Sequence, residues 1–307
     1  MLHLETWWGL RQTEYDLRYE NNFHIRLKTN ETNSLSFGIS YRFVSLGIGF
    51  TPAFLNSNAE KISKGETERF DIGAGFSFGR LYTSAEYSKV QGFYLDNIKD
   101  FAMLTDTPYI LFPNQSASIA GIFLRYNLNR KFSVSGISGG TQQQLRSAFS
   151  VLPSFYGNYF KFKSVDTSQK PLGIGYMNNM DFNLVLPLVG TLVIGKNGYI
   201  TGGAGFSLGL DFFNSVSYYD TSQQRRSNGT SVSTGYFLKA GAGYNQKRFF
   251  CGTEYELRGY GHSLDNSAGI RKKFSYLKLY FGWRIHETSW EKKTLDWINK
   301  TSPVKLE

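Results

Sequence analysis

The chain has 307 residues and a formal net charge of +10, from 34 Lys and Arg against 24 Asp and Glu. Its length suits one large β-barrel or two ordinary domains, and no Pro-rich, Gly/Ser-rich or charge-block linker divides it. No apolar run approaches the ~18 residues of a transmembrane helix, and the single cysteine excludes both an intrachain disulfide and a CxxC metal site.

Period-two alternation between two kinds of side chain recurs along the chain. It is present in residues 44–51 and 70–79 and is clearest in residues 199–213, YITGGAGFSLGLDFF, which contain four glycines. In that stretch one face is apolar and the other is mostly Gly, Ser and Thr. The exposed face of a soluble sheet favours long polar side chains, so small ones indicate a confined space. The pattern therefore predicts a transmembrane β-barrel with apolar residues toward lipid and small residues toward a narrow lumen.

Twelve long strands are predicted in an antiparallel up-and-down barrel. They span residues 4–17, 34–42, 44–53, 69–78, 80–90, 116–128, 131–143, 173–194, 198–213, 231–244, 247–260 and 272–285. Tight turns near 43, 79, 127–131, 196 and 245–247 alternate with long connections at 54–66, 92–114, 146–172, 214–229 and 261–270. Short periplasmic turns and longer extracellular loops are typical of outer-membrane barrels.

Residues 155–165, FYGNYFKFKSV, decide the strand count. Short and long connections alternate consistently around a barrel of twelve strands only if this segment belongs to an extracellular excursion. If it is a barrel strand, residues 23–28 must be one too, and the barrel has fourteen strands. We expect twelve.

The barrel is expected to occupy residues 1–286, and residues 287–307 form a periplasmic tail. That tail contains TSWEKKTLDWINK, in which Trp290, Trp297 and Ile298 are near helical spacing. A short amphipathic helix and a disordered tail are both compatible with this sequence. The N-terminal MLHLETWWGL lacks the charged and apolar regions of a signal peptide, so we expect a mature or trimmed form of an exported chain.

Several motifs resemble a known family. The runs SLSFGISYRFVSLGIGF, DIGAGFSFGRLY, VQGFYLDN, LFPN, SIAGIFLRYNLNRKFS and QLRSAFS are similar to Bacteroidetes outer-membrane proteins classed as domain-of-unknown-function family 4421. The likeness runs from about Leu4 to Trp283, although LKTN at residues 27–30 lacks the proline of the usual Tyr-x-Pro-Asn. The resemblance implies an outer-membrane barrel and supplies no activity and no catalytic residues.

Charged residues on the predicted lumen face are the candidate binding residues. They are Arg42, Asp71, Glu86, Arg125, Asp211, Lys239, Glu254, Glu256, Arg258, Lys278 and Arg284. Charges of both signs in a confined lumen are expected to pair, because an unpaired buried charge is costly. The set fits either a salt-bridged plug that fills the barrel or a charged constriction that selects solutes.

Catalytic chemistry has little support in the sequence. Only GHSLDN, residues 261–266, places His, Ser, Asp and Asn close together, and His262 and Ser263 point to opposite faces of an extended strand. A polar surface loop is the expectation there. No His, Asp or Glu spacing indicates a metal, and no cofactor is predicted.

The connection at residues 92–114 is unusually apolar for a surface loop. Its residues Phe93, Tyr94, Phe101, Met103, Leu104, Tyr109, Ile110, Leu111 and Phe112 must be buried. They form either a lid over neighbouring loops or a lining for a ligand site in the mouth. Residues 146–172 add six aromatic side chains, and the two segments are expected to form one cap.

The function expected is binding or restricted passage of a small solute at a loop-capped, charged lumen. A membrane-embedded lipid-modifying enzyme and a structural or assembly component of the outer membrane remain alternatives. Expected partners are outer-membrane lipids, including lipopolysaccharide, and a small solute. No basic run or recognition helix accompanies the positive charge, so nucleic acid is not expected.

Overall fold

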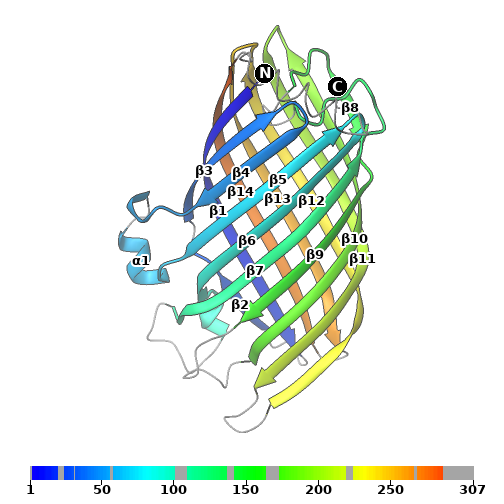
Figure 1. The fold of residues 1–307 in the computed structure, drawn as a ribbon. Coiled ribbons are helices and arrows are strands. Elements are labelled where there is room, and N and C mark those ends of the chain that lie inside the picture. The colour runs from blue at the N-terminus through cyan, green and yellow to red at the C-terminus, as the bar shows by residue number, and fades with distance from the viewer. Residues whose placement is uncertain are drawn as a thin grey trace, which may run out of the picture.

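The computed structural model describes residues 2–285 except 20–23, 31, 56–57, 101–108, 137–141, 164–172, 219–223 and 266–267. Within this part, twelve antiparallel strands form a closed barrel, as predicted (Figure 1). The ring contains β1 (Leu2–Tyr19), β3 (Thr32–Tyr41), β4 (Val44–Phe50), β5 (Glu68–Phe78), β6 (Leu81–Leu95), β7 (Leu111–Tyr126), β9 (Ser154–Lys163), β10 (Gly173–Ile194), β11 (Gly198–Tyr218), β12 (Gln224–Asn245), β13 (Phe249–Asp265) and β14 (Ala268–Ile285). The pairing of β1 with β14 joins the first strand to the last.

The outer surface of the barrel is apolar and the inner surface is small or polar. On β11, Phe206 is 77% exposed and Leu208 is 62% exposed, whereas Ser207 and Asp211 are buried. The same alternation continues on β10 and β12, where the large apolar side chains at even positions are exposed. An apolar belt around a closed barrel satisfies the two requirements of a lipid-spanning sheet, which are an apolar exterior and no unpaired strand edge.

The two ends of the barrel differ in their connections. At one end, called the tight-turn end, short turns at residues 42–43, 79–80, 195–197 and 246–248 join strands, and β1 begins where β14 ends. Arg42, Gly79 and Gly195 have φ of 48°, 58° and 61° in these turns. At the opposite end, called the loop end, lie the connections from β4 to β5 and from β6 to β7.

One predicted strand is wrong, and another replaces it. Residues 131–143 contain no strand in their described part, and the barrel strand between β7 and β10 is β9, which was assigned to an excursion. The short β8 (Ala148–Val151) pairs with β10 beside it. The inward face of β9 carries Tyr156, Phe160 and Phe162 rather than small residues, because the interior at the loop end is apolar. The expectation that inward-facing positions carry small residues therefore did not identify β9 as a barrel strand.

A further strand outside the ring narrows the barrel at the loop end. β2 (His24–Lys28) pairs with β1 on one edge and with β6 on the other, beyond the ends of β3, β4 and β5. It lies off the twelve-strand ring, so the fourteen-strand alternative is wrong. One strand replaces three at this level, and fewer strands enclose a narrower interior.

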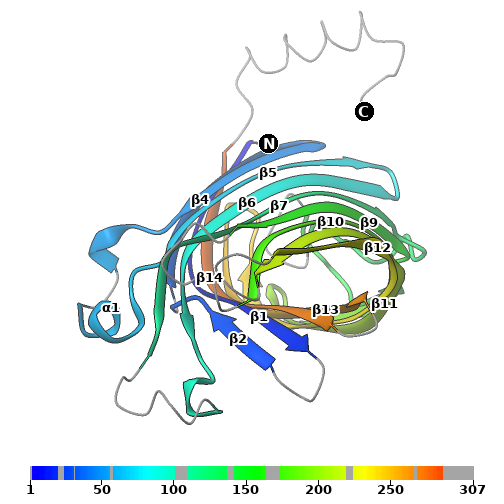
Figure 2. The ribbon, with the colours of Figure 1, turned by 90° about the horizontal axis from the view of Figure 1, so that it is seen from below.

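The hairpins at the loop end are longer than predicted. β11 and β12 reach residues 218 and 224, and β13 and β14 reach 265 and 268, so the long loops expected at 214–229 and 261–270 are mostly strand. The helical segments are η2 (Ala53–Leu55), α1 (Asn58–Lys64) and η3 (Ile98–Asp100), and α1 lies outside the barrel wall (Figure 2). None of the helices in the described residues is long and apolar enough to cross a bilayer. The predicted tail, residues 287–307, falls outside the described residues.

Candidate functional site

An apolar core fills the inside of the barrel at the loop end. It is called the apolar plug and consists of Tyr15, Leu17, Ile25, Leu27, Val90, Phe93, Leu95, Ile98, Phe112, Ala117, Phe160, Phe162, Met177, Phe213 and Ile270. The Tyr15 ring lies at its centre, with ring centroids 5.4 Å from Phe160 and 5.7 Å from Phe93. Because these side chains are almost fully buried, water is excluded from this level of the lumen.

The plug partly replaces the expected loop cap. Phe93, Tyr94 and Phe112 belong to β6 and β7 rather than to a loop, and they are buried. Phe101, Met103 and Leu104 lie outside the described residues. On β9, Phe160 and Phe162 face inward and pack with Phe93 and Phe112 in the plug, whereas Tyr159 is 43% exposed on the outside, so the two segments meet inside the barrel rather than in a loop cap.

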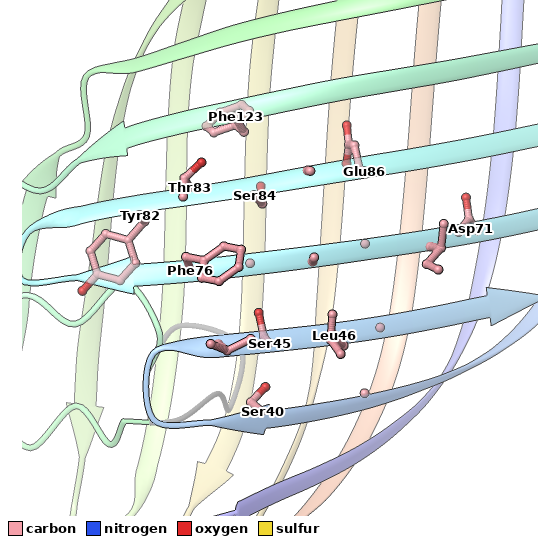
Figure 3. A pocket seen from close by; sticks show the side chains of 18 of the residues that line it. Ser40, Ser45, Leu46, Asp71, Phe76, Tyr82, Thr83, Ser84, Glu86 and Phe123 are labelled. Carbon is pink, nitrogen blue, oxygen red and sulfur yellow. The ribbon is translucent and has the colours of Figure 1, made fainter. Parts of the chain in front are cut away.

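Toward the tight-turn end the lumen holds a polar cavity. Two connected spaces of about 580 and 320 Å³ share the lining residues Arg11, Asp71, Glu86, Ser88 and Arg258. Figure 3 shows the wall formed by β3 to β7, with Ser40, Ser45, Asp71 and Glu86 labelled. Gly and Ser on the inward face of β3, β4 and β5 leave the room that larger side chains would fill.

Charged side chains from β1, β13 and β14 also line the cavity. Lys239 Nζ lies 2.8 Å from one carboxylate oxygen of Glu254, and Lys278 Nζ lies 3.6 Å from the other. Arg258 Nε is 2.5 Å from Glu256 Oε1. Paired charges of this kind satisfy one another in a confined space, which is the expected arrangement for a lumen of both signs.

The remaining predicted lumen residues occupy different environments. Glu86 accepts a hydrogen bond of 3.1 Å from the Tyr156 hydroxyl, and Asp71 pairs with Arg11. Arg284 donates to the Gln246 carbonyl and to Asn245 Oδ1 at the tight-turn end. Arg42 lies in a turn rather than on a strand face, although it contributes to the cavity wall.

Arg125 on β7 differs from Arg11, Arg258 and Lys278, which form ion pairs with carboxylates of the cavity. Its guanidinium lies 4.8 Å from the centre of the Phe123 ring, and no carboxylate among the described residues forms an ion pair with it. Its Nε is buried without a hydrogen-bond partner. Arg125 therefore presents to the cavity a positive charge that no described carboxylate balances through a direct ion pair.

Three charged residues of the cavity are not among the predicted lumen residues. Glu5 and Arg11 lie on β1, and Arg69 on β5 donates a 2.6 Å hydrogen bond to Thr13. The alternation of Leu4, Thr6 and Leu10 with odd-numbered residues in the first predicted strand is the signal that places Glu5 and Arg11 inward.

A second polar cluster lies apart from the cavity. His262 Nε2 is 3.1 Å from Asp211 Oδ2 and 2.8 Å from the Asn179 amide nitrogen, and Lys272 Nζ is 3.0 Å from Asp181 Oδ2. His262 belongs to β13, so the surface loop expected there is wrong for this residue. The side chain of Ser263 lies outside the described part. Strand register joins residues that are 83 positions apart, a relation that residue spacing cannot reveal.

The connection between β7 and β9 folds across the tight-turn end, although a tight turn was expected at residues 127–131. Phe132 packs with Leu152 and Val189 inside the barrel, and Gln143 donates to the Asn245 carbonyl and to Asn197 Oδ1. Val134 and Ser135 line the polar cavity. The described parts of this segment, residues 127–136 and 142–153, therefore narrow access to the cavity from the tight-turn end.

Known structures with similar chains are β-barrels at low similarity. The β domain of the Bordetella autotransporter BrkA is 10% identical over 90% of this chain and 98% of its own, with a TM-score of 0.40. The Pseudomonas putida toluene transporter TodX is 10% identical over 92% and 88% of the two chains, with a TM-score of 0.30. OmpT of Vibrio cholerae is 10% identical over 90% and 97%, with a TM-score of 0.29. Similarity this low supports no argument about function.

A comparison with curated proteins finds no match. The model of a family described as a domain of unknown function, DUF4421, matches residues 9–284. Because this match covers nearly the whole barrel, the chain belongs to the DUF4421 family.

Proposed function

We propose that this protein is a β-barrel of a Bacteroidetes outer membrane whose lumen binds a small solute carrying an anionic group. The solute enters from the tight-turn end, which faces the periplasm. The observation that carries the proposal is Arg125, a cation without an ion pair among the described residues, in the wall of a cavity of about 580 Å³.

The exterior supports the membrane location. Exposed Phe206, Leu208 and Leu210 belong to an apolar belt that would be unfavourable in water, and the closed ring leaves no strand edge in that belt. Phe54 and Ile62, in η2 and α1, are 81% and 83% exposed outside the wall. Apolar side chains on a short segment beside such a belt fit the lipid interface, where outer-membrane lipids would cover them.

The cavity supports binding of an anion. A guanidinium binds carboxylate and phosphate groups through two parallel hydrogen bonds, and it does so more strongly where water is partly excluded. Carboxylates of Glu254 and Glu256 are already engaged by Lys239 and Arg258, so they compete little for Arg125. The paired charges also offer polar contacts to a zwitterionic solute.

The plug favours binding or restricted passage over a permanently open pore. A solute that crosses the barrel must displace Tyr15, Phe160 and the side chains packed on them, which are nearly fully buried. The lipid-modifying enzyme alternative has less support, because the recorded partners of His262 are Asn179 and Asp211 rather than a Ser hydroxyl.

Arg125→Met tests the proposal. Detergent-solubilised protein is titrated with small carboxylates and phosphates, and binding is followed by thermal shift and by calorimetry. At least one anion should raise the melting temperature of the wild type, and the variant should bind it about tenfold more weakly, a loss of about 1.4 kcal/mol. Lys89→Met is the control, because Lys89 is an exposed cation on the outward face of β6. Equal binding by the wild type and Arg125→Met, or no binding to any anion, contradicts the proposal.

A further inference from the structure

The second polar cluster lies one inward-facing position from the apolar plug. On three strands, a plug residue is followed two positions along by a cluster residue: Met177 by Asn179, Ile270 by Lys272 and, in the reverse direction, Phe213 by Asp211. Asp181 pairs directly with Asp211 in the register of β10 and β11. His262 reaches the cluster from β13. The cluster is therefore held by a rigid part of the barrel wall.

Three polar atoms in the cluster form a close triangle. Asp211 Oδ2, His262 Nε2 and the Asn179 amide nitrogen are separated by 3.1, 2.8 and 3.0 Å. If the Asn179 amide donates to both neighbours, the unprotonated imidazole nitrogen faces the carboxylate, and two acceptors lie in contact. If the amide is turned over and His262 Nε2 carries the proton, Nε2 donates to both oxygens, and the two oxygens lie in contact with no proton between them. With an ionised Asp211, no arrangement of protons satisfies all three edges.

The cluster also carries unsatisfied groups, and it contains two carboxyl groups for one ammonium group. Among the described residues, no hydrogen-bond partner reaches the buried atoms Asp181 Oδ1, Asp211 Oδ1, Asn179 Oδ1 and His262 Nδ1. Asn179 is 1% exposed and Asp211 is 0% exposed. Two carboxylates face one ammonium group, that of Lys272, since neutral His262 contributes no charge. Buried polar atoms left in this state are costly, so a bound positive charge stabilises them.

We propose that Asp181, Asp211 and His262, with the Asn179 amide oxygen, bind a divalent transition-metal ion of the zinc class. Ligand atoms of the two carboxylates and the imidazole lie within 4.8 Å of one another. Ligands 2.0–2.2 Å from a tetrahedral zinc ion are about 3.4 Å apart, close to the edges of the triangle. An imidazole ligand favours zinc over Mg²⁺ or Ca²⁺, which prefer oxygen ligands.

Lys272 has a supporting role at this site. Its ammonium group lies 3.0 Å from Asp181 Oδ2 and 4.1 Å from the centre of the Phe160 ring. Asp181 Oδ1 is the oxygen without a partner, so it is the one available to the ion. Lys272 orients the carboxylate and balances its charge, as groups around metal ligands commonly do. The ion would tie β10, β11 and β13 together beside the plug.

Metal binding by the wild-type protein is the first test. The full chain, folded in detergent, is dialysed against a chelator, returned to metal-free buffer and titrated with Zn²⁺ or Co²⁺. About one ion should bind per chain, Co²⁺ should give the visible absorption of a tetrahedral site, and Zn²⁺ should raise the melting temperature. A wild-type chain that binds neither ion overturns the proposal, because a protonated carboxylate then accounts for the cluster.

Variants assign the binding to these residues. Asp211→Asn and His262→Gln should each weaken Co²⁺ binding by at least tenfold, whereas Glu254→Gln, which alters a buried carboxylate of the other charge cluster, should leave it unchanged. Co²⁺ binding that survives in both ligand variants overturns the assignment. Arg125 belongs neither to the proposed metal site nor to the charge cluster of Glu254, so the result of this test does not depend on whether the cavity binds an anion.

Discussion

Single glycines in β11 allow its close approach to β10. A Cβ atom on Gly209 would lie 2.1 Å from the Phe182 carbonyl oxygen and 2.6 Å from Asn183 Oδ1. On the outward face of the same strand, a Cβ on Gly202 meets nothing closer than 3.9 Å. Glycine is therefore required at one of these positions by packing, and it is merely tolerated at the other.

Gly209→Ala should destabilise the barrel, and Gly202→Ala should not. The first substitution forces β10 and β11 apart at a cost of about 1 to 3 kcal/mol. The second removes chain entropy from the unfolded state and is neutral or stabilising by up to about 1 kcal/mol. Urea unfolding in detergent, followed by tryptophan fluorescence, measures both. Equal stability of the two variants would show that the strands do not approach as closely as described.

β2 is an example of an element held by side chains as much as by strand pairing. Asn97, which is buried, accepts a 2.8 Å hydrogen bond from the Arg26 amide and donates 2.9 Å to the His24 carbonyl and 3.0 Å to Asp100. β2 pairs with β6 only through Leu27 and Lys28. The Asn97 side chain thus adds two hydrogen bonds to the strand that narrows the barrel, beside the pairing of that strand with β1.

Asn97→Ala should loosen β2 while leaving the twelve-strand ring intact. The substitution removes both contacts to β2 and leaves the Arg26 amide without its acceptor, a local loss of about 1 to 3 kcal/mol. Hydrogen exchange of the β2 amides should become faster, whereas exchange in β11 and β12 should stay the same. Asn114→Ala is the matched control, since Asn114 is exposed on β7. Unchanged exchange in β2 would mean that strand pairing alone holds it.

At the scale of the whole molecule, two barriers lie in series along the lumen. Residues 127–136 and 142–153 narrow the tight-turn end, and the apolar plug fills the loop end, with the charged cavity between them. Opening the first barrier gives access to the cavity, but only opening the second makes a path through the barrel. A dewetted apolar constriction blocks ions even without tight steric closure.

The wild type should therefore be nearly silent in planar-bilayer recordings. Phe132→Ser, which disturbs only the tight-turn end, should leave it silent. Replacing both Phe160 and Phe162 with Ser should raise single-channel conductance, because polar groups then hydrate the plug level. Heat modifiability on gels checks that each variant is folded. A conducting wild type would contradict the series arrangement, as would a folded but silent double variant.

The sequence by itself determined the exterior of this protein. A closed barrel in lipid requires apolar side chains at every second position of each strand. This local requirement can be recognised in residues 199–213 alone, without knowing which strands pair with them. For the same reason the inward parity of Asp71, Glu254 and Lys278 follows from strand phase alone.

Only the tertiary structure decided what fills the interior. The lumen changes from small residues to a polar cavity to an apolar plug along its length, so no single inward pattern identifies a strand, and β9 was missed for that reason. The contact of His262 with Asp211 and Asn179 depends on the register of β10 to β13. Register is set by the pairing of whole strands, and residues distant in sequence carry no local signal that they will meet.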